Sequence, residues 1–133
     1  MKRIRKIGLA VLRGGKLLLV RNKNTSKYIM PGGRIEKNES DIETLRREIL
    51  EELTYKINGD EVKYVGEYED IASNDADSIV NIKLYIGDII GEFFPSNEIE
   101  EFVWFNPNMD NWELLSDIIK NKIIPDLIKK KYL

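Results

Sequence analysis

One segment of the chain constrains the fold more than any other, because it predicts a helix with a defined start and a defined buried side. Ser40 and Glu43 have the spacing of a capping box, in which each side chain accepts a hydrogen bond from the other residue's backbone N–H. Apolar residues then recur at helical spacing, at Ile42, Leu45, Ile49 and Leu53. We therefore expect an amphipathic helix that begins near Asp41, ends near residue 54 and packs against the rest of the fold.

Three carboxylates lie along one flank of this predicted helix, at Glu48, Glu51 and Glu52. At about 100° per residue, positions i, i+3 and i+4 fall within roughly 100° of arc. Like charges at this spacing repel one another, so the fold gains nothing from them unless a cation binds there. Mg²⁺ takes oxygen ligands and completes its shell with carboxylates, waters and substrate phosphates. The spacing therefore indicates a divalent-cation site, with Glu48 and Glu52 beside the buried stripe and Glu51 nearer to solvent.

A glycine pair and an arginine flank this acidic group. Gly32 and Gly33 follow Pro31, and two glycines allow positive φ angles and a close approach of the backbone to phosphate or metal. Arg47 is next to Glu48 in sequence and is expected to point to another side of the helix, where Glu39 is its nearest candidate partner. Such a pair would hold the loop against the helix.

The pattern resembles the box of the Nudix hydrolase family, which reads G, five residues, E, seven residues, R-E-U, one residue, E-E, one residue, G-U, with U a bulky apolar residue. The match is carried by Gly33, Glu39, Arg47, Glu48, Ile49, Glu51 and Glu52, within a box that spans residues 33–55. Thr54 stands at the last glycine of the box and Tyr55 at the aliphatic position. Threonine adopts the left-handed conformation poorly, so we expect the helix to end differently or to continue toward Asn58.

The resemblance implies an α+β fold, the family's α/β/α sandwich, with a mixed central sheet, the box loop and helix, and a C-terminal helix. It implies that Glu48, Glu51 and Glu52 ligate Mg²⁺ or Mn²⁺ and serve as the catalytic carboxylates, and that Gly33, Glu39 and Arg47 brace the box. Members of the family often recruit one more acidic residue from another loop, and Glu98 is our candidate for it. Which carboxylate acts as the base, and how many ions bind, stay open at this point.

The activity implied by the resemblance is the hydrolysis of a phosphoanhydride in a nucleoside diphosphate joined to another group. Small single-domain members that resemble MutT act on nucleoside triphosphates or oxidised nucleotides and release a nucleoside monophosphate, and we favour this group. Other members act on ADP-ribose and sugar nucleotides, on dinucleoside polyphosphates or on the 5′ end of RNA. Two readings without turnover also remain: a nucleotide-binding module that does not catalyse, and a purely structural metal site.

Composition limits the other classes of function. The chain has 133 residues, 42% of them hydrophobic, and we expect a single domain over residues 1–133. Twenty-one basic and 23 acidic residues give a net charge of −2, which favours neither a stable nucleic-acid partner nor a membrane surface. The chain contains no cysteine and no histidine, which excludes disulfides, thiolate sites and serine–histidine triads. Without a long apolar segment we expect a cytoplasmic protein whose oligomeric state is open, a homodimer included.

The remaining elements follow from hydrophobic periodicity. Strands are expected near residues 3–12, 16–22, 61–70, 79–90 and 100–105, with Gly14–Gly15 as the turn of a hairpin. Helical structure closes the chain after Asn111, with a kink or two short helices at Pro125. Five aromatic residues could stack on a nucleobase, although core packing is the more common use of such side chains: Tyr28, Phe93, Phe94, Trp104 and Trp112.

Overall fold

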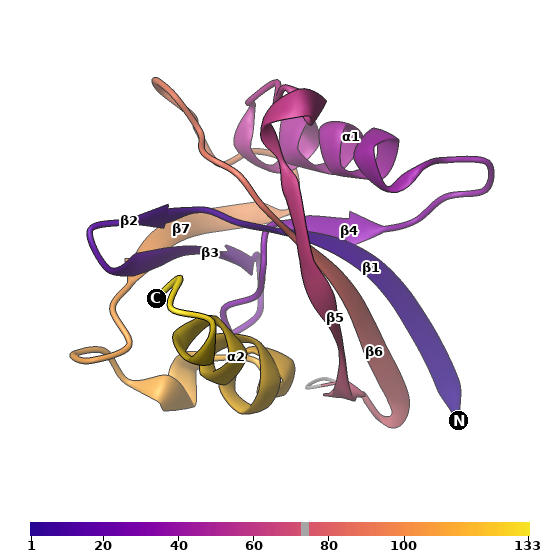
Figure 1. The fold of residues 1–133 in the computed structure, drawn as a ribbon. Coiled ribbons are helices and arrows are strands. Elements are labelled where there is room, and N and C mark those ends of the chain that lie inside the picture. The colour runs from indigo at the N-terminus through magenta and orange to yellow at the C-terminus, as the bar shows by residue number, and fades with distance from the viewer. Residues whose placement is uncertain (73–74) are drawn as a thin grey trace.

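The computed structural model describes residues 1–72 and 75–133 and contains two small sheets and two α-helices (Figure 1). The strands are β1 (Lys2–Ala10), β2 (Leu12–Arg13), β3 (Lys16–Asn22), β4 (Gly32–Arg34), β5 (Lys63–Ala72), β6 (Asp75–Ile86) and β7 (Ile99–Phe105). The helices are α1 (Asp41–Leu53) and α2 (Ile124–Lys129), with 3₁₀ turns at Gly59–Glu61 and Trp112–Leu114. A π-helical turn at Ile119–Ile123 leads directly into α2.

The expected mixed sheet is present as four strands in the order β4-β1-β6-β5, in which β1 and β6 run parallel and the other pairs are antiparallel. A second, antiparallel sheet has the order β2-β3-β7. The strand expected over residues 3–12 is therefore two strands, β1 and β2, one in each sheet. The Gly14–Gly15 turn joins β2 to β3 as expected, with both φ angles positive.

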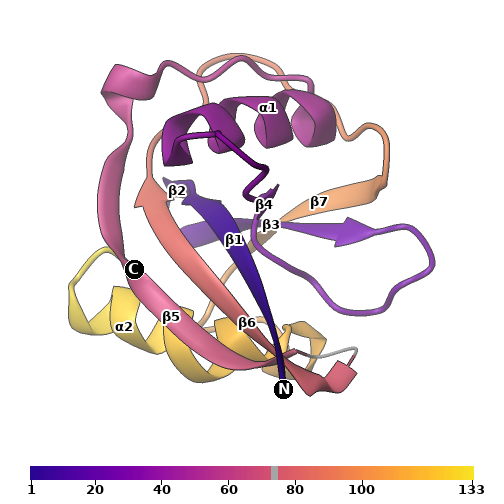
Figure 2. The ribbon, with the colours of Figure 1, turned by 90° about the vertical axis from the view of Figure 1, so that its right-hand side faces the viewer.

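The helices lie on opposite sides of the strands, as Figures 1 and 2 show, and each covers its own apolar cluster. On the α1 side, Leu45, Ile49 and Leu53 are fully buried against strand residues such as Ile7 and Leu9. On the α2 side, Ile119, Ile123 and Leu127 are fully buried and pack against the other cluster, to which Leu17 and Leu19 belong. Burying each such side chain contributes about 1.5–3 kcal/mol, so the two clusters fix the three-layer arrangement.

Helix α1 begins where the capping box predicts. The Glu43 N–H donates to Ser40 Oγ at 3.1 Å, and the Ser40 N–H donates to Glu43 Oε1 at 2.9 Å. The expectation for its end was wrong, because the helix neither continues nor changes its exit. It ends at Leu53, and Thr54 itself takes the left-handed conformation, with φ 54° and ψ 37°.

The C-terminal region is broken into short helical pieces, as Pro125 led us to expect. Pro125 lies in the first turn of α2, directly after the π-helical turn Ile119–Ile123, so the change of helix type falls next to the proline. Across the two described segments of the chain, no helix has the length and apolar character needed to cross a membrane.

Candidate active site

Strand β4 brings the glycine pair against both β1 and α1. Gly33 lies opposite Ile7 and Gly32 opposite Gly8 in the antiparallel register. Gly32 has a φ of 136°, and a β-carbon there would lie 2.0 Å from the Ile7 carbonyl oxygen, so only glycine fits. The Gly32 N–H donates to Glu52 Oε1 at 2.8 Å. The sequence indicated a loop at these residues, and their pairing with β1 makes the segment an edge strand.

Arg47 connects the loop before α1 to the acidic flank of the helix. Its Nε donates to Glu39 Oε2 at 2.8 Å and its Nη2 to Glu39 Oε1 at 3.0 Å, so the expected pair is present, and it is bidentate. Nη2 also donates to the Arg34 carbonyl oxygen at 3.0 Å. Against expectation, Arg47 also reaches its own neighbour, since Nη1 donates to Glu48 Oε1 at 2.6 Å. One guanidinium therefore joins β4, the loop and α1.

The carboxylates of the box have different electrostatic surroundings. Hydrogen bonds from Arg47, with others from the Glu36 N–H and the Thr44 hydroxyl, lower the pKa of Glu39 to about 2. Burial raises the pKa of Glu48, against the opposing effect of Arg47. Burial also raises the pKa of Glu52 to about 8, and the Glu48 charge adds to the shift. Glu39 is thus held as a permanent anion, whereas Glu48 and Glu52 lack sufficient compensation for their charge.

No group of three or more acidic, histidine or cysteine side chains within residues 1–72 and 75–133 is arranged to hold a metal ion. Glu48 is turned toward Arg47, and Glu52 toward the Gly32 N–H. Glu51 is the exposed member, with 48% of its side chain accessible against 16% for Glu48. The donor chemistry nevertheless fits a hard divalent cation, because two poorly compensated carboxylates and an accessible third lie within electrostatic reach of one another.

Glu98 lies on the loop that leads to β7, and this loop is fastened to the end of α1. The Ser96 N–H donates to the Glu52 carbonyl oxygen at 2.9 Å, and the Ser96 hydroxyl donates to the Glu51 carbonyl oxygen. The Glu98 side chain is exposed, and its backbone carbonyl accepts from the Lys23 N–H at 2.8 Å. The loop therefore reaches the acidic end of the box helix, and a role for Glu98 at the site stays a prediction.

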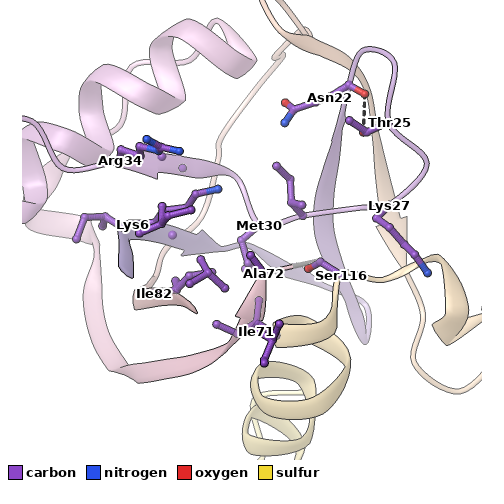
Figure 3. Close-up of a pocket in the computed structure, with 18 of the residues that line it drawn as sticks. Lys6, Asn22, Thr25, Lys27, Met30, Arg34, Ile71, Ala72, Ile82 and Ser116 are labelled. Carbon is purple, nitrogen blue, oxygen red and sulfur yellow. Dashed lines mark hydrogen bonds between the residues drawn. The ribbon is translucent and has the colours of Figure 1, made fainter. Parts of the chain in front are cut away.

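A cleft of about 500 Å³ opens beside these residues, on the α2 side of β1 and β4 (Figure 3). Gly32 and Gly33 belong to its wall. Gly32 also donates a hydrogen bond to the carboxylate of Glu52, and Gly33 lies beside the carboxylate of Glu48. The opposite end of the cleft reaches Lys27 and Ser116. The cleft thus runs from β4, whose other side adjoins the acidic flank of α1, to the start of the C-terminal helical region.

Several residues that line this cleft were not found by sequence reasoning, among them Lys6, Arg34 and Ser116. Lys6 could have been found, because strand alternation places it on the same face as Ile4, Gly8 and Ala10, which is otherwise apolar. Burial lowers its pKa, although the nearby Glu52 and Glu48 oppose that effect. Ser116 carries no such signal. Its hydroxyl is buried and has no hydrogen-bond partner among the described residues.

The five aromatic residues considered for base stacking do not line the described cleft. Phe93 packs against Phe102 and Trp104, and Trp112 packs against Phe105. The Tyr28 hydroxyl donates to Glu101 Oε1 at 3.1 Å. Phe94 is 57% exposed. Core packing therefore accounts for Phe93, Trp104 and Trp112.

Comparison with known proteins gives the same assignment as the box. A Bacillus subtilis (strain 168) protein named "Putative 8-oxo-dGTP diphosphatase YtkD" is 26% identical over 122 residues, which cover 88% of this chain and 73% of that protein. The crystal structure of the MutT protein from Methanosarcina mazei Go1 matches with a TM-score of 0.78 at 18% identity, covering 98% of this chain and 96% of that one. The solution structure of the E. coli ORF135 protein matches with a TM-score of 0.70 at 24% identity, covering 98% and 94%.

The two solved structures establish the fold, since their sequence identities are low. The family is established separately by the model of the NUDIX domain, which matches residues 2–127. Members of this family act on nucleotide substrates and generally use divalent metal ions. Because that match spans nearly the whole chain and includes the complete charged part of the box, this protein belongs to the Nudix family and is a pyrophosphohydrolase.

Proposed function

We propose that this protein uses Mg²⁺ or Mn²⁺ to hydrolyse a (deoxy)nucleoside triphosphate or an oxidised nucleotide, and that it releases the nucleoside monophosphate. The observation that carries the proposal is the position of Glu48 and Glu52, two partly buried carboxylates beside a cleft of about 500 Å³. Clefts of roughly 300–1,000 Å³ accommodate small-molecule ligands. A nucleotide in this cleft would have its phosphates at the Gly32–Gly33 end, next to the carboxylates.

The choice of substrate is supported by the name of the Bacillus subtilis relative, which describes a diphosphatase of an oxidised guanine nucleotide. The cleft is bounded by elements of one small domain, which suits a free nucleotide better than a large polymer. ADP-ribose, sugar nucleotides, dinucleoside polyphosphates and RNA 5′ ends are the competing substrates within the same chemistry.

Each residue of the site has a proposed task. Glu48, Glu51 and Glu52 would hold the divalent ion, which when bound supplies charge neutralisation at the phosphoryl oxygens. The Gly32 N–H orients Glu52, and Arg47 orients Glu48 while Glu39 holds Arg47 in place. In the reaction, the oxygen of a water molecule bonds to phosphorus and the anhydride P–O bond breaks, so that pyrophosphate leaves. The proton of the water passes to a carboxylate of the site, for which Glu98 is a further candidate.

The test is a substrate panel with Mg²⁺ or Mn²⁺ present, read by release of phosphate and pyrophosphate. The panel contains nucleoside triphosphates, oxidised dGTP, ADP-ribose, diadenosine polyphosphates and 5′-triphosphate RNA. We expect turnover of a triphosphate or oxidised nucleotide, reduced at least a hundredfold in Glu51→Gln and Glu52→Gln, with Glu100→Gln as an exposed control. Unchanged turnover in both site variants would contradict the proposal, as would nucleotide binding without any turnover.

A further inference from the structure

Two cations stand opposite each other on the strands that form the cleft wall. Lys6 of β1 is the direct cross-strand partner of Arg34 of β4, so both side chains lie on the same face of the sheet. Both line the cleft, and Figure 3 shows the Lys6 side chain extending into it with Arg34 beside it. Like charges placed directly opposite on antiparallel strands destabilise the pair. The fold therefore gains nothing from this pair unless an anion lies between or above the two cations.

Neither cation is neutralised by a direct partner in the described part of the chain. Neither Lys6 nor Arg34 makes an ion pair or a side-chain hydrogen bond there, in contrast to Arg47, which binds Glu39 and Glu48. On the opposite side of the cleft, Lys27 is already occupied, since its ammonium donates to the Glu113 carbonyl oxygen. Lys6 and Arg34 are thus the two cations of the cleft wall whose side chains donate to no group among residues 1–72 and 75–133.

These two cations also lie next to the acidic flank of α1. Lys6 and Arg34 are neighbours across β1 and β4, and the charges of Glu52 and Glu48 act on Lys6 by raising its pKa against the effect of burial. Arg34 directly follows Gly33 on β4, so the two residues face opposite sides of the strand: Arg34 faces the cleft, whereas a β-carbon on Gly33 would lie 2.3 Å from the carboxyl carbon of Glu48. Because β4 is an edge strand, a chain of phosphoryl groups that ran from the cleft around this edge to the carboxylates would pass Lys6 and Arg34.

We propose that Lys6 and Arg34 form a polyphosphate-binding pair that grips the phosphoryl oxygens on the cleft side of the cleaved anhydride and so favours substrates with a chain of phosphates. The proposal rests on the proposed function for the identity of the substrate, and on the β1–β4 register for the pair itself. Charge-assisted hydrogen bonds of this kind contribute about 1.5–3 kcal/mol each, which corresponds to a roughly tenfold to hundredfold change in affinity. The guanidinium of Arg34 can donate hydrogen bonds to two phosphoryl oxygens at once, whereas the Lys6 ammonium acts as a point charge.

The first experiment measures binding of inorganic triphosphate by calorimetry, with EDTA present so that no divalent ion contributes. We expect Lys6→Met and Arg34→Met each to weaken binding about tenfold or more, and Lys6→Arg to retain most of the affinity. Arg5→Met is the matched control, because Arg5 precedes Lys6 on β1 and faces the other side of the sheet, outside the cleft. Binding that is unchanged in Lys6→Met and Arg34→Met, or equally weakened in Arg5→Met, would overturn the proposal.

The second experiment separates this inference from the proposed function. With the nucleotide that the wild type hydrolyses best, we expect KM to rise about tenfold in Arg34→Met and in Lys6→Met. If the wild type hydrolyses no nucleotide, but triphosphate binding still depends on Lys6 and Arg34, then the proposed function fails and the binding pair stands. If the wild type is active and both variants match it in binding and in KM, the pair fails and the proposed function stands. Arg34 is exposed, so Arg34→Met should fold even if Lys6→Met does not.

Discussion

Gly33 provides the space in which the carboxyl group of Glu48 sits. A β-carbon at Gly33 would lie 2.3 Å from Glu48 Cδ and 2.5 Å from Oε2, and the backbone φ lies outside the left-handed region. We expect Gly33→Ala to fold, because alanine is compatible with this backbone, but to displace Glu48 and lower kcat/KM at least tenfold. The measurement is steady-state kinetics, with the melting temperature as the check on folding.

A double variant that combines Gly33→Ala with Glu48→Gln tests whether the effect of Gly33→Ala depends on Glu48. If Gly33→Ala acts through that carboxylate, then combining it with Glu48→Gln should cost little more than Glu48→Gln alone. Losses that simply multiply in the double variant would show that the glycine matters for another reason.

Ser116 has a buried hydroxyl with no hydrogen-bond partner among the described residues, and it lines the cleft. An unpaired buried hydroxyl costs about 1–3 kcal/mol, a cost that a polar group of a bound ligand would relieve. We expect Ser116→Ala to unfold at the same temperature as the wild type or higher, while KM for the hydrolysed nucleotide rises about tenfold. Ser78→Ala is the matched control, because the Ser78 hydroxyl is also buried but donates to Asp75 Oδ2 at 2.6 Å. The Ser78→Ala control should lose stability and keep its KM. If Ser116→Ala instead loses stability and keeps its KM, a role for Ser116 in binding is contradicted.

The end of α1 shows how a helix can stop without the glycine that the box has at this position. The left-handed conformation costs Thr54 about 1–2 kcal/mol. Its hydroxyl lies 3.2 Å from the Phe94 carbonyl oxygen and 3.3 Å from Ser96 Oγ, and the Phe94 N–H donates to the Leu53 carbonyl oxygen at 2.9 Å. The loop before β7 thus supplies partners for the helix end, and these offset the strain at Thr54.

Two substitutions at Thr54 separate the strain from the hydrogen bonds. Thr54→Gly removes both, so its free energy of unfolding should stay within about 1 kcal/mol of the wild type. Thr54→Ala loses the hydroxyl contacts but keeps a side chain at positive φ, so it should be the less stable variant by about 1 kcal/mol. Urea denaturation measures the difference. Equal stability of the two variants would mean that the left-handed conformation of residue 54 carries no cost.

Among the helices and strands, local sequence signals predicted some elements and could not predict others. The start of α1 depends on Ser40 and Glu43, three residues apart, so the sequence was sufficient to place it. The end of α1 depends on residues about forty positions away along the chain, in the loop at Phe94 and Ser96, and no pattern within the helix contains that information. Strand β4 is equally non-local, because three residues become a strand only through their pairing with β1.

For the whole molecule, the sheet edge formed by β4 separates two chemically different regions. Glu48 and Glu52 adjoin this strand from the α1 side, and the cleft adjoins it from the α2 side. Glu48, Glu51 and Glu52 were visible in the sequence as one group because they share one helix. The cleft was not, since its walls come from β1, β4, the segment around residues 22–30 and the start of the C-terminal helical region. The chemistry of the site is thus encoded locally, and the space for its substrate is encoded by the topology.

Stability of the whole fold should depend on pH through the buried carboxylates. Folding raises the pKa of Glu52 to about 8, so the folded state binds a proton more tightly than the unfolded state does. The free energy of unfolding of the metal-free protein should therefore be highest near pH 5 and should fall as the pH rises toward 8. The chain has no histidine, so few other side chains titrate in this interval besides Glu48, whose pKa is raised in the same direction. Urea denaturation in EDTA across this range measures the effect.

Divalent ions should reverse this trend, because they bind the ionised carboxylates of the folded state. We expect Mg²⁺ to raise the melting temperature clearly at pH 8 and little at pH 5, where protons compete for the same oxygens. Glu52→Gln should flatten the pH dependence in EDTA and reduce the gain from Mg²⁺, whereas Glu100→Gln should change neither. A Mg²⁺ gain of equal size at both pH values, or one retained in Glu52→Gln, would place the ion away from Glu52. The same carboxylates oppose folding when they are ionised and no metal ion is bound. As the pH rises, the affinity for Mg²⁺ should therefore increase, and the stability of the metal-free protein should decrease over the same range.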